Sequence, residues 1–284
     1  MTLFFAGCGG SAPPQSRAPV LHDQATSNMD SPTFAGDAAD GFLPNSELPT
    51  PLVRRNLKAD FLIYDGKGVD STDTSAIVKL IRAHGLTERT ISESALNSLT
   101  AAEFAQYGTF IWPGGDNEEM DTVISASARR ELRKAVIQKG LNYVGICAGA
   151  FIAVGPSAGV EETPVAGLAL LNGTFIDNYR PASGNPISMV WTDFPDGSRR
   201  DLILWWGPYF ETQTGVVARY SADGRPAMIQ GRVGHSFVVL SGPHPEAPQS
   251  WRKAGGLEDE DGLDTDIAWR LIQAAHTHHP LPTF

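Results

Sequence analysis

Four apolar runs alternate with helical segments between residues 59 and 146, and this alternation restricts the fold more than any other feature of the sequence. Apolar residues recur at helical spacing in residues 72–83 and again in residues 122–139. The apolar runs occupy residues 60–64, 87–92, 109–112 and 141–146. Short apolar strands separated by helices form mostly parallel sheets that are buried on both faces. We therefore expect an α/β fold with helices on both faces of the sheet.

Beyond about residue 158 the pattern changes to short strands separated by glycine and proline, which predicts a β-rich insertion or extension. A further apolar strand follows at residues 235–240, and a final helix is expected at about residues 265–275. The expected short strands are residues 165–175, 186–191, 201–210, 216–220 and 227–229.

The first residues resemble the end of a bacterial lipoprotein signal. Residues 1–8 form a short apolar run that ends in Phe5-Ala6-Gly7-Cys8, in which Cys8 would carry the lipid. Residues 9–55 are rich in Pro, Ser, Ala and Gly and predict a flexible tether. The main domain is then expected at residues 56–276, with a C-terminal tail at 277–284. We expect a lipid-anchored protein that faces the periplasm at the bacterial cell envelope; the alternative is an accidental resemblance and a cytoplasmic protein.

Composition excludes some classes of partner. The 284 residues are 42% hydrophobic, enough for a sizeable core, and the formal charge is -10. Nucleic acid is not expected as a partner, because phosphate binding requires clustered Lys and Arg. Apart from the N-terminal anchor, no segment approaches the ~20 apolar residues of a membrane helix. The sequence does not indicate the oligomeric state.

Two other clusters have more than one interpretation, and neither predicts a metal site or a cofactor. The acidic run from Glu258 to Asp266 is either a calcium loop or, as its irregular spacing favours, a solvated loop before the last helix. His276, His278 and His279 are either metal ligands or, without carboxylate or cysteine companions, part of a disordered polar tail.

The fourth apolar run ends in Gly145-Ile146-Cys147-Ala148-Gly149, which is the cysteine counterpart of a nucleophile elbow. In such a turn small neighbours allow the tight backbone, and the amide after the nucleophile is left to bind an oxyanion. An isolated cysteine at the end of a strand is otherwise a small buried hydrophobe. Cys147 is thus a candidate nucleophile.

A cysteine nucleophile needs a base, because an ordinary thiol with a pKa of about 8.5 is only about 3% ionised at pH 7. His244 and Glu246 follow the strand at residues 235–240, and in extended backbone their side chains emerge on one face. Glu246 would orient one ring nitrogen while the other faces the thiol. The alternative is that His244 only caps a turn in a proline-rich loop.

Further candidates flank these residues. Gly114 or Gly115, at the end of the third strand, would supply an oxyanion amide together with Ala148. Asp116 and Asn117 either contact substrate or cap the next helix. One residue of the Trp205-Trp206 pair belongs to the core, and Trp206 and Tyr209 are candidates for substrate contact.

Together the ordered motifs resemble the class I glutamine amidotransferase-like superfamily. Within it, they are similar to the domain at the N-terminus of eukaryotic biotin-protein ligases and to its stand-alone bacterial form. The resemblance covers about residues 59–275 and implies a flavodoxin-like sheet and a Cys147-His244-Glu246 triad. The motifs are Phe110-Ile111-Trp112-Pro113-Gly114-Gly115, Gly145-Ile146-Cys147-Ala148-Gly149-Ala150, Trp205-Trp206-Gly207-Pro208-Tyr209-Phe210 and Gly242-Pro243-His244-Pro245-Glu246.

The resemblance does not extend to a biotin ligase catalytic domain, so biotin ligation is not expected. The first functional hypothesis is a hydrolase or amidase in which Cys147 attacks a small-molecule or peptide amide or ester. The second hypothesis is a catalytically silent domain that binds a ligand or partner at the cell envelope.

Overall fold

The structure is a computed structural model and describes residues 57–154, 167–171 and 175–284. The described residues all belong to the unit Gly41–Phe284 of the chain. The expected signal at residues 1–8, with Cys8, and the tether at residues 9–55 lie outside the described residues. Among the helices of the described part, none is long and apolar enough to cross a membrane.

A nine-stranded sheet forms the centre of the described part, in the order β2-β1-β3-β4-β11-β10-β9-β6-β7. The first five strands in this order are parallel, as the sequence predicts. Trp112 of β3 pairs with Gly145 of β4, and Ile146 of β4 pairs with Ser241 of β11. Three strands therefore end at the same edge, where ligands of parallel sheets bind. The parallel strands are β1 (Ala59–Tyr64), β2 (Glu88–Ile91), β3 (Tyr107–Trp112), β4 (Asn142–Ile146) and β11 (Ser236–Ser241).

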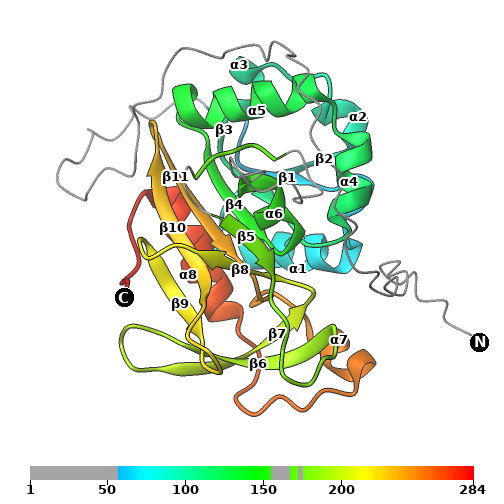
Figure 1. Cartoon of the computed structure of the whole chain (residues 1–284). Helices are drawn as coiled ribbons and strands as arrows, with labels where there is room; N and C mark the ends of the chain where they lie inside the picture. Colours follow the sequence, from blue (N-terminus) through cyan, green and yellow to red (C-terminus); the bar gives the residue numbers. More distant parts are fainter. Residues whose placement is uncertain (1–56, 155–166, 172–174) are drawn as a thin grey trace, which may run out of the picture. The chain divides into compact units, whose positions relative to one another are not determined.

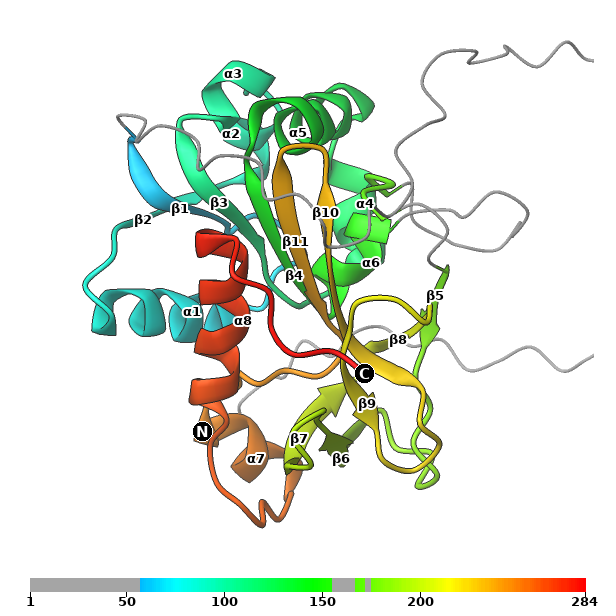
Figure 2. The ribbon, with the colours of Figure 1, turned by 90° about the vertical axis from the view of Figure 1, so that its left-hand side faces the viewer.

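Helices cover both faces of this parallel part (Figure 1). Phe110 and Tyr143 pack toward the helices of one face, whereas Ile111 and Val144 pack toward the other face. This alternation follows from the two-residue period of a strand. In Figure 2, α1 and α8 lie together on the near face. The helices are α1 (Ser71–Ala83), α2 (Glu93–Leu96), α3 (Ala101–Phe104), α4 (Asn117–Val123), α5 (Ala126–Lys139), α6 (Ala148–Val154), α7 (Gln249–Gly255) and α8 (Thr265–Thr277).

The helix expected at residues 122–139 is present but begins later, as α5 at Ala126, whereas Thr122 and Val123 belong to the separate helix α4. Ile124 adopts extended backbone, and the side chain of Ser125 accepts a hydrogen bond from the amide of Ala128. Ser125 is thus the N-cap of α5, a position that serine favours. Gly140 ends α5 with φ 77°, a left-handed conformation that glycine adopts at little cost. Local capping overrides the continuous helical spacing.

The β-rich part expected after residue 158 is present, and four of its strands continue the central sheet in antiparallel fashion. The strand expected at residues 201–210 divides into two, because Trp206 has φ 52°, a left-handed conformation that interrupts the extended backbone between β7 and β8. In the described part of the expected strand 165–175, residues 167–171 are not a strand. The strands are β5 (Phe175–Asn178), β6 (Ile187–Asp193), β7 (Arg199–Trp205), β8 (Pro208–Glu211), β9 (Val216–Tyr220) and β10 (Pro226–Val233), with β5 and β8 forming a separate pair.

The C-terminal histidines and tail pack on the domain, so the interpretation as a disordered polar tail is wrong. His276 lies within α8, with its Nδ1 atom 3.0 Å from the Thr109 hydroxyl and its ring 4.6 Å from that of Phe61. Beyond the helix, the amide of Leu281 donates to the side chain of Gln230 at 2.9 Å. These contacts hold the last residues against β10 and the face covered by α8.

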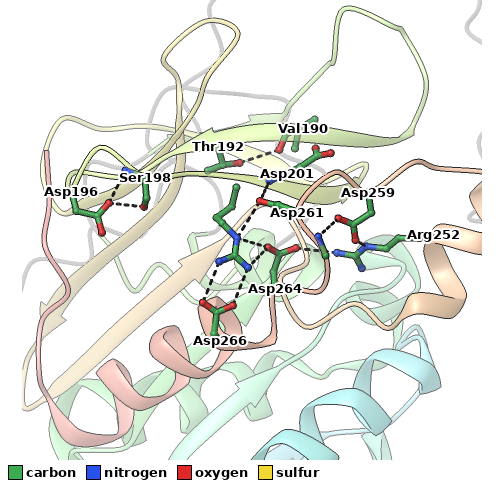
Figure 3. A network of polar contacts seen from close by, with 12 residues as sticks. Val190, Thr192, Asp196, Ser198, Asp201, Arg252, Asp259, Asp261, Asp264 and Asp266 are labelled. Carbon is green, nitrogen blue, oxygen red and sulfur yellow. Dashed lines mark hydrogen bonds and ion pairs between the residues drawn. The ribbon is translucent and has the colours of Figure 1, made fainter.

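The acidic run before α8 is a largely exposed loop, as expected, and several of its carboxylates also form an ion-pair network with two arginines (Figure 3). Asp264 is fully buried between two guanidinium groups, those of Arg200 at 3.1 Å and Arg252 at 3.0 Å. Arg252 also pairs with Asp259, while Arg200 also pairs with Asp261. Arg200, which is far away in the sequence, and Arg252, on the preceding helix, thus compensate part of the negative charge of the run, which the local spacing of acidic residues did not indicate.

Asp201 provides a pH-dependent prediction from this network. Burial and the charges of Asp261 and Asp259 raise the pKa of Asp201 to about 6, against a backbone hydrogen bond at Glu260. Because the folded-state pKa is raised, the stability that Asp201 contributes is complete below about pH 4 and is lost as the pH rises through 6. Asp201→Asn removes this loss.

The quantity of interest is the free energy of unfolding of Asp201→Asn minus that of wild type. We expect this difference to be more favourable to the variant at pH 7 than at pH 4 by about 1–2 kcal/mol, after allowance for solvent screening. Urea unfolding of both proteins at the two pH values measures this gain. An equal difference between the proteins at both pH values would contradict the assignment.

Candidate active site

Cys147 lies in a sharp turn between β4 and α6, at the edge where the parallel strands end. Its φ of 49° is left-handed, which is rare for a residue other than glycine and typical of a strained strand-to-helix turn. The amide of Cys147 donates to the carbonyl of Ser241 at 2.8 Å, and the Tyr143 hydroxyl donates to the Gly149 carbonyl at 2.8 Å. The turn is therefore fixed from both sides.

The two glycines of the motif are required by close packing of the backbone. A Cβ atom at Gly145 would lie 2.5 Å from the carbonyl oxygen of Gly149. At Gly149 it would overlap the carbonyl oxygen of Trp112, the last residue of β3. The glycines thus allow the start of α6 to approach β3 and β4, and this approach presents Cys147 at the end of the sheet.

His244 and Glu246 follow β11, the strand beside β4. The Nδ1 atom of His244 lies 2.7 Å from Oε1 of Glu246, and each residue is 2% exposed. The amide of His244 donates to the carbonyl of Ile203 at 2.8 Å, which fixes the loop to β7. Because Nδ1 is engaged by Glu246, Nε2 is the ring atom that is available to a neighbouring group. The structure thus favours an oriented imidazole over a simple turn cap.

Cys147 lies near enough to His244 to influence the pKa of its ring. Burial lowers the pKa of His244, but the charge of Cys147, its hydrogen bond and the charge of Asp73 together raise that pKa above its ordinary value. The thiol also lies 3.4 Å from the carbonyl oxygen of Trp205, to which it donates. The structure therefore brings together the three side chains that the sequence analysis grouped, Cys147, His244 and Glu246.

Asp73, which the sequence analysis missed, lies against the same histidine. It is fully buried in the first turn of α1, and its Oδ2 atom is 3.7 Å from Nδ1 of His244. Locally the sequence resembles a helix cap, and Asp70 does cap α1 by accepting from the amide of Thr72 at 2.8 Å. Only the position of α1 at the end of β1, beside the other strand ends, indicates a role for Asp73.

The structure distinguishes between the two glycines proposed for an oxyanion site. The amide of Gly114 donates to Oδ2 of Asp73 at 2.6 Å, so Gly114 is not a free donor and that expectation is wrong. The amides of Gly115 and Ala148 have no hydrogen-bond acceptor among the described residues. Gly115 has φ 144°, a conformation that disfavours any side chain.

The four residues considered for substrate contact lie in different settings. Asp116 caps α4 by accepting from the amides of Glu118 and Glu119 at 3.0 Å, which is the capping alternative. Asn117 is the first residue of α4. Trp206 is 42% exposed beside the carbonyl that the thiol contacts, whereas Trp205 packs on Trp251 at 5.3 Å. The exposed side chain of Trp206 makes it a better candidate for substrate contact than Asp116.

Tyr209 lies at a different hollow, which has a volume of about 640 Å³. Its ring stacks under the guanidinium of Arg225 at 4.3 Å, and its hydroxyl donates to Glu211 at 3.3 Å. The residues that line this hollow do not include Cys147, His244 or Glu246. Contact between Tyr209 and a substrate held at Cys147 is therefore not supported by its position.

Asp73, His244 and Glu246 are also the residues that offer the donor atoms for a metal ion, since one such atom from each lies within 4.8 Å of the others. In the structure, however, protein groups already engage these atoms: His244 pairs with Glu246, and Gly114 donates to Asp73. A metal ion would have to displace both hydrogen bonds. The arrangement fits an oriented histidine better than a metal centre.

Gly114 gives a direct test of the packing around His244. A Cβ atom at Gly114 would overlap Cε1 of His244 and lie 2.9 Å from Oδ2 of Asp73. We expect Gly114→Ala to lower the free energy of unfolding by about 1–3 kcal/mol, the usual cost of overpacking.

Thermal and urea unfolding measure this loss. Gly85→Ala is a matched control, because Gly85 has φ 72° but no atom within 4 Å of an added Cβ; its loss is expected to be about 1–2 kcal/mol of backbone strain. Gly114→Ala is also expected to change the alkylation rate of Cys147, which Gly85→Ala leaves unchanged. A Gly114→Ala protein with unchanged stability and unchanged alkylation would contradict the observed packing.

Comparison with solved structures places this fold in a known class. No protein-family model matches the sequence, and no curated protein sequence matches it either. A crystal structure of a glutamine amidotransferase aligns with 70% of this chain and 100% of its own, with 16% identity and a TM-score of 0.50. The chain therefore has a glutamine amidotransferase-like α/β fold with a β-rich extension.

Two further structures align with lower scores. The first is a protein from Thermoplasma acidophilum that is assigned as one of the subunits of a GMP synthase, with 13% identity, 76% of this chain, 98% of that chain and a TM-score of 0.46. The second is a β-galactosidase from the Antarctic haloarchaeon Halorubrum lacusprofundi, with 14% identity, 80% of this chain, 32% of that chain and a TM-score of 0.49.

Proposed function

We propose that the protein is a hydrolase or amidase of the glutamine amidotransferase-like type, with Cys147 as nucleophile. The observation that carries this proposal is the contact of Cys147, in a turn with φ 49°, with His244, whose Nδ1 atom is 2.7 Å from Glu246. This is the arrangement of nucleophile, base and orienting acid that acyl transfer by a cysteine requires. The substrate class is a small-molecule or peptide amide or ester.

The reaction follows from the roles of the three side chains. Nε2 of His244 takes the thiol proton while Sγ of Cys147 bonds to the carbonyl carbon, and the carbonyl electron pair moves to oxygen. The tetrahedral intermediate collapses, and His244 returns the proton to the departing amine or alcohol. Water, activated by His244, then hydrolyses the thioester and restores the thiol. Glu246 holds the ring in the tautomer that each step needs.

Stabilisation of the oxyanion is assigned to the amides of Ala148 and Gly115. Ala148 begins α6 directly after the nucleophile, and its amide points from a helix N-terminus, where the partial charge is positive. Gly115 lies in the loop that Asp73 ties to the His244 side of the site through Gly114. Both amides are free of acceptors among the described residues, as an oxyanion site requires.

The finer family assignment and the location in the cell also belong to this proposal. The ordered motifs support kinship with the stand-alone form of the biotin-protein ligase N-terminal domain, without ligase activity. We further propose that Cys8 is lipidated and anchors the protein at the bacterial cell envelope. Bacterial expression in the presence of labelled palmitate tests this: label should enter wild type and be absent from Cys8→Ala, whereas an unlabelled wild type would contradict it.

A second function, a silent binding domain, is favoured by one observation: Cys147 and His244 are only 4% and 2% exposed. A buried pair of this kind can preserve the elbow geometry without turnover. The two functions differ in whether the thiol bonds to the ligand.

A screen of amide and ester substrates separates the two functions. Wild type is expected to hydrolyse at least one class, Cys147→Ala to lose this turnover, and a trapped thioester to appear on Cys147 by mass spectrometry. Lys253→Ala, a substitution of an exposed residue of α7, is the control for unspecific effects. Equal ligand binding by wild type and Cys147→Ala, with no turnover and no adduct, would establish the binding function instead.

A further inference from the structure

Asp73 is a fully buried carboxyl group to which the proposed reaction gives no role. Its Oδ2 atom accepts from the amide of Gly114 at 2.6 Å and lies 3.7 Å from Nδ1 of His244. A buried charge is costly unless it is paired and hydrogen-bonded. One backbone amide alone does not compensate a full negative charge, so the protonation state of Asp73 needs a physical explanation.

The other oxygen atoms of Asp73 and Glu246 supply that explanation. Oδ1 of Asp73 and Oε2 of Glu246 are both buried, and neither receives a donor from the described residues when both carboxyl groups are ionised. The two side chains nevertheless lie side by side, with a carboxyl oxygen of Asp73 within 4.8 Å of one of Glu246, and each influences the pKa of the other. Two carboxylates have no donor between them, so this pair can form a hydrogen bond only when one member carries a proton.

We propose that Asp73 holds this proton and donates it in a hydrogen bond to Glu246, so that Asp73 is the positioning residue of a Cys147-His244-Glu246-Asp73 relay. The proposal rests on the proposed function only in assigning a catalytic purpose to the relay; the position of the proton is independent of it. In this arrangement Glu246 remains ionised and accepts from both His244 and Asp73. The two orphaned oxygen atoms then satisfy one another.

The surrounding charges agree with this placement of the proton. Burial and the charge of Glu246 raise the pKa of Asp73 well above its ordinary value, while the charge of His244 opposes them. Burial raises the pKa of Glu246 to about 7, whereas a hydrogen bond from Asp73 and the charge of Arg252 lower it. The titratable and charged groups around the pair and His244 are Asp70 at the N-cap of α1, Cys147 at the elbow, His244 in the loop after β11 and Arg252 on α7.

A protonated Asp73 also links the base to the proposed oxyanion site. Through Oδ2 it fixes the amide of Gly114, next to Gly115, and through its proton it fixes Glu246 and therefore the His244 ring. The Trp251 indole, which contacts the His244 ring at 5.0 Å, also donates to the hydroxyl of Thr72 at 2.6 Å, the residue before Asp73. The first turn of α1 thus supports the histidine from two directions.

Asp73→Asn and Asp73→Ala separate this proposal from a purely structural role. An asparagine can reproduce both hydrogen bonds, because its oxygen accepts from Gly114 and its NH₂ group donates to Glu246. We expect Asp73→Asn to keep the iodoacetamide alkylation rate of Cys147 at pH 7 within about threefold of wild type. Asp73→Ala should lower the rate by roughly tenfold or more, the effect of leaving a buried hydrogen-bonding group without a partner. Asp65→Asn, at an exposed aspartate directly after β1, is the control for the same change of side chain.

Two readouts do not depend on reactivity and are made in the Cys147→Ala background. The pKa of Asp73 is raised in the folded state. The stability that the protonated pair contributes is therefore complete below the unfolded-state carboxyl pKa of about 4, and it is lost as the pH rises through the folded-state pKa values of the pair. Asp73→Asn should therefore show a smaller fall in melting temperature between pH 5 and 8. At pH 8, above the pKa values of about 6 for Asp201 and about 7 for Asp264, the infrared carbonyl band of a protonated carboxyl group should be present in the Cys147→Ala parent and absent from its Asp73→Asn derivative.

Three results would overturn the proposal. The first is a protonated-carboxyl band that persists in Asp73→Asn and disappears in Glu246→Gln, which would place the proton on Glu246. The second is an Asp73→Asn protein as impaired as Asp73→Ala, which would mean that Asp73 acts as an anion. The third is an unchanged pH dependence of stability. If instead wild-type Cys147 is unreactive while the band behaves as expected, the proposed function fails and the position of the proton stands.

Discussion

Arg252→Ala is expected to lower the free energy of unfolding by about 3–5 kcal/mol, as removal of one partner from a buried ion pair does. Arg252 is fully buried and pairs with Asp259 and, at 3.0 Å, with Asp264, which is also fully buried. The substitution leaves both aspartates with less compensation (Figure 3). It also removes a hydrogen bond of 2.9 Å to the carbonyl of Ala247, the residue after Glu246.

Urea unfolding at pH 7 measures the loss, with Lys253→Ala as the control because Lys253 is the exposed neighbour on the same helix. Lys253→Ala is expected to change the free energy of unfolding by no more than about 0.5 kcal/mol, as for most surface substitutions. A loss below about 1 kcal/mol in Arg252→Ala would show that the network acts like a surface ion pair.

Gly149→Ala is expected to lower the free energy of unfolding by about 3 kcal/mol, at the upper end of overpacking. The added Cβ would overlap the backbone carbonyl of Trp112, which cannot move away by a change of rotamer. Because Gly149 lies in the first turn of α6, the strain would also displace the elbow at Cys147. Stability and Cys147 reactivity should therefore fall together.

Gly255→Ala is the control for this substitution, since Gly255 is also helical and its added Cβ would lie 3.1 Å from the flexible side chain of Leu257. Alanine has the higher helix propensity, so Gly255→Ala should change stability by less than about 1 kcal/mol. Equal effects at Gly149 and Gly255 would mean that the close approach of α6 to β3 does not constrain the turn.

The parallel half of the sheet is predictable from sequence because each buried strand is a short apolar run between helical segments. The elbow is predictable because Gly145, Cys147 and Gly149 lie within five consecutive residues and all belong to one tight turn. The predicted α/β class with its β-rich extension is confirmed by the sheet order and by the glutamine amidotransferase-like fold. Local patterns thus determine most of the scaffold.

The features that escaped prediction depend on partners far away in the sequence. Asp73 resembles a helix-cap acid until α1 is placed beside the end of β11. The burial of Asp264 in an otherwise exposed acidic loop is explained only when Arg200 and Arg252 are placed against it. The break between α4 and α5 is local, because it depends on whether Ser125 caps a helix or continues one. The two conformations of serine have similar free energies, so the sequence alone does not decide between them.

The pH dependence of Cys147 alkylation tests the central claim most directly, namely that His244 activates the thiol. The chain has only two cysteines, so a Cys8→Ala background makes iodoacetamide specific for Cys147. An ordinary thiol is only about 3% ionised at pH 7, so a fully activated Cys147 should react about 30 times faster than Cys147 in His244→Ala. Equal rates and equal pH profiles for the two proteins, at equal stability, would contradict the account.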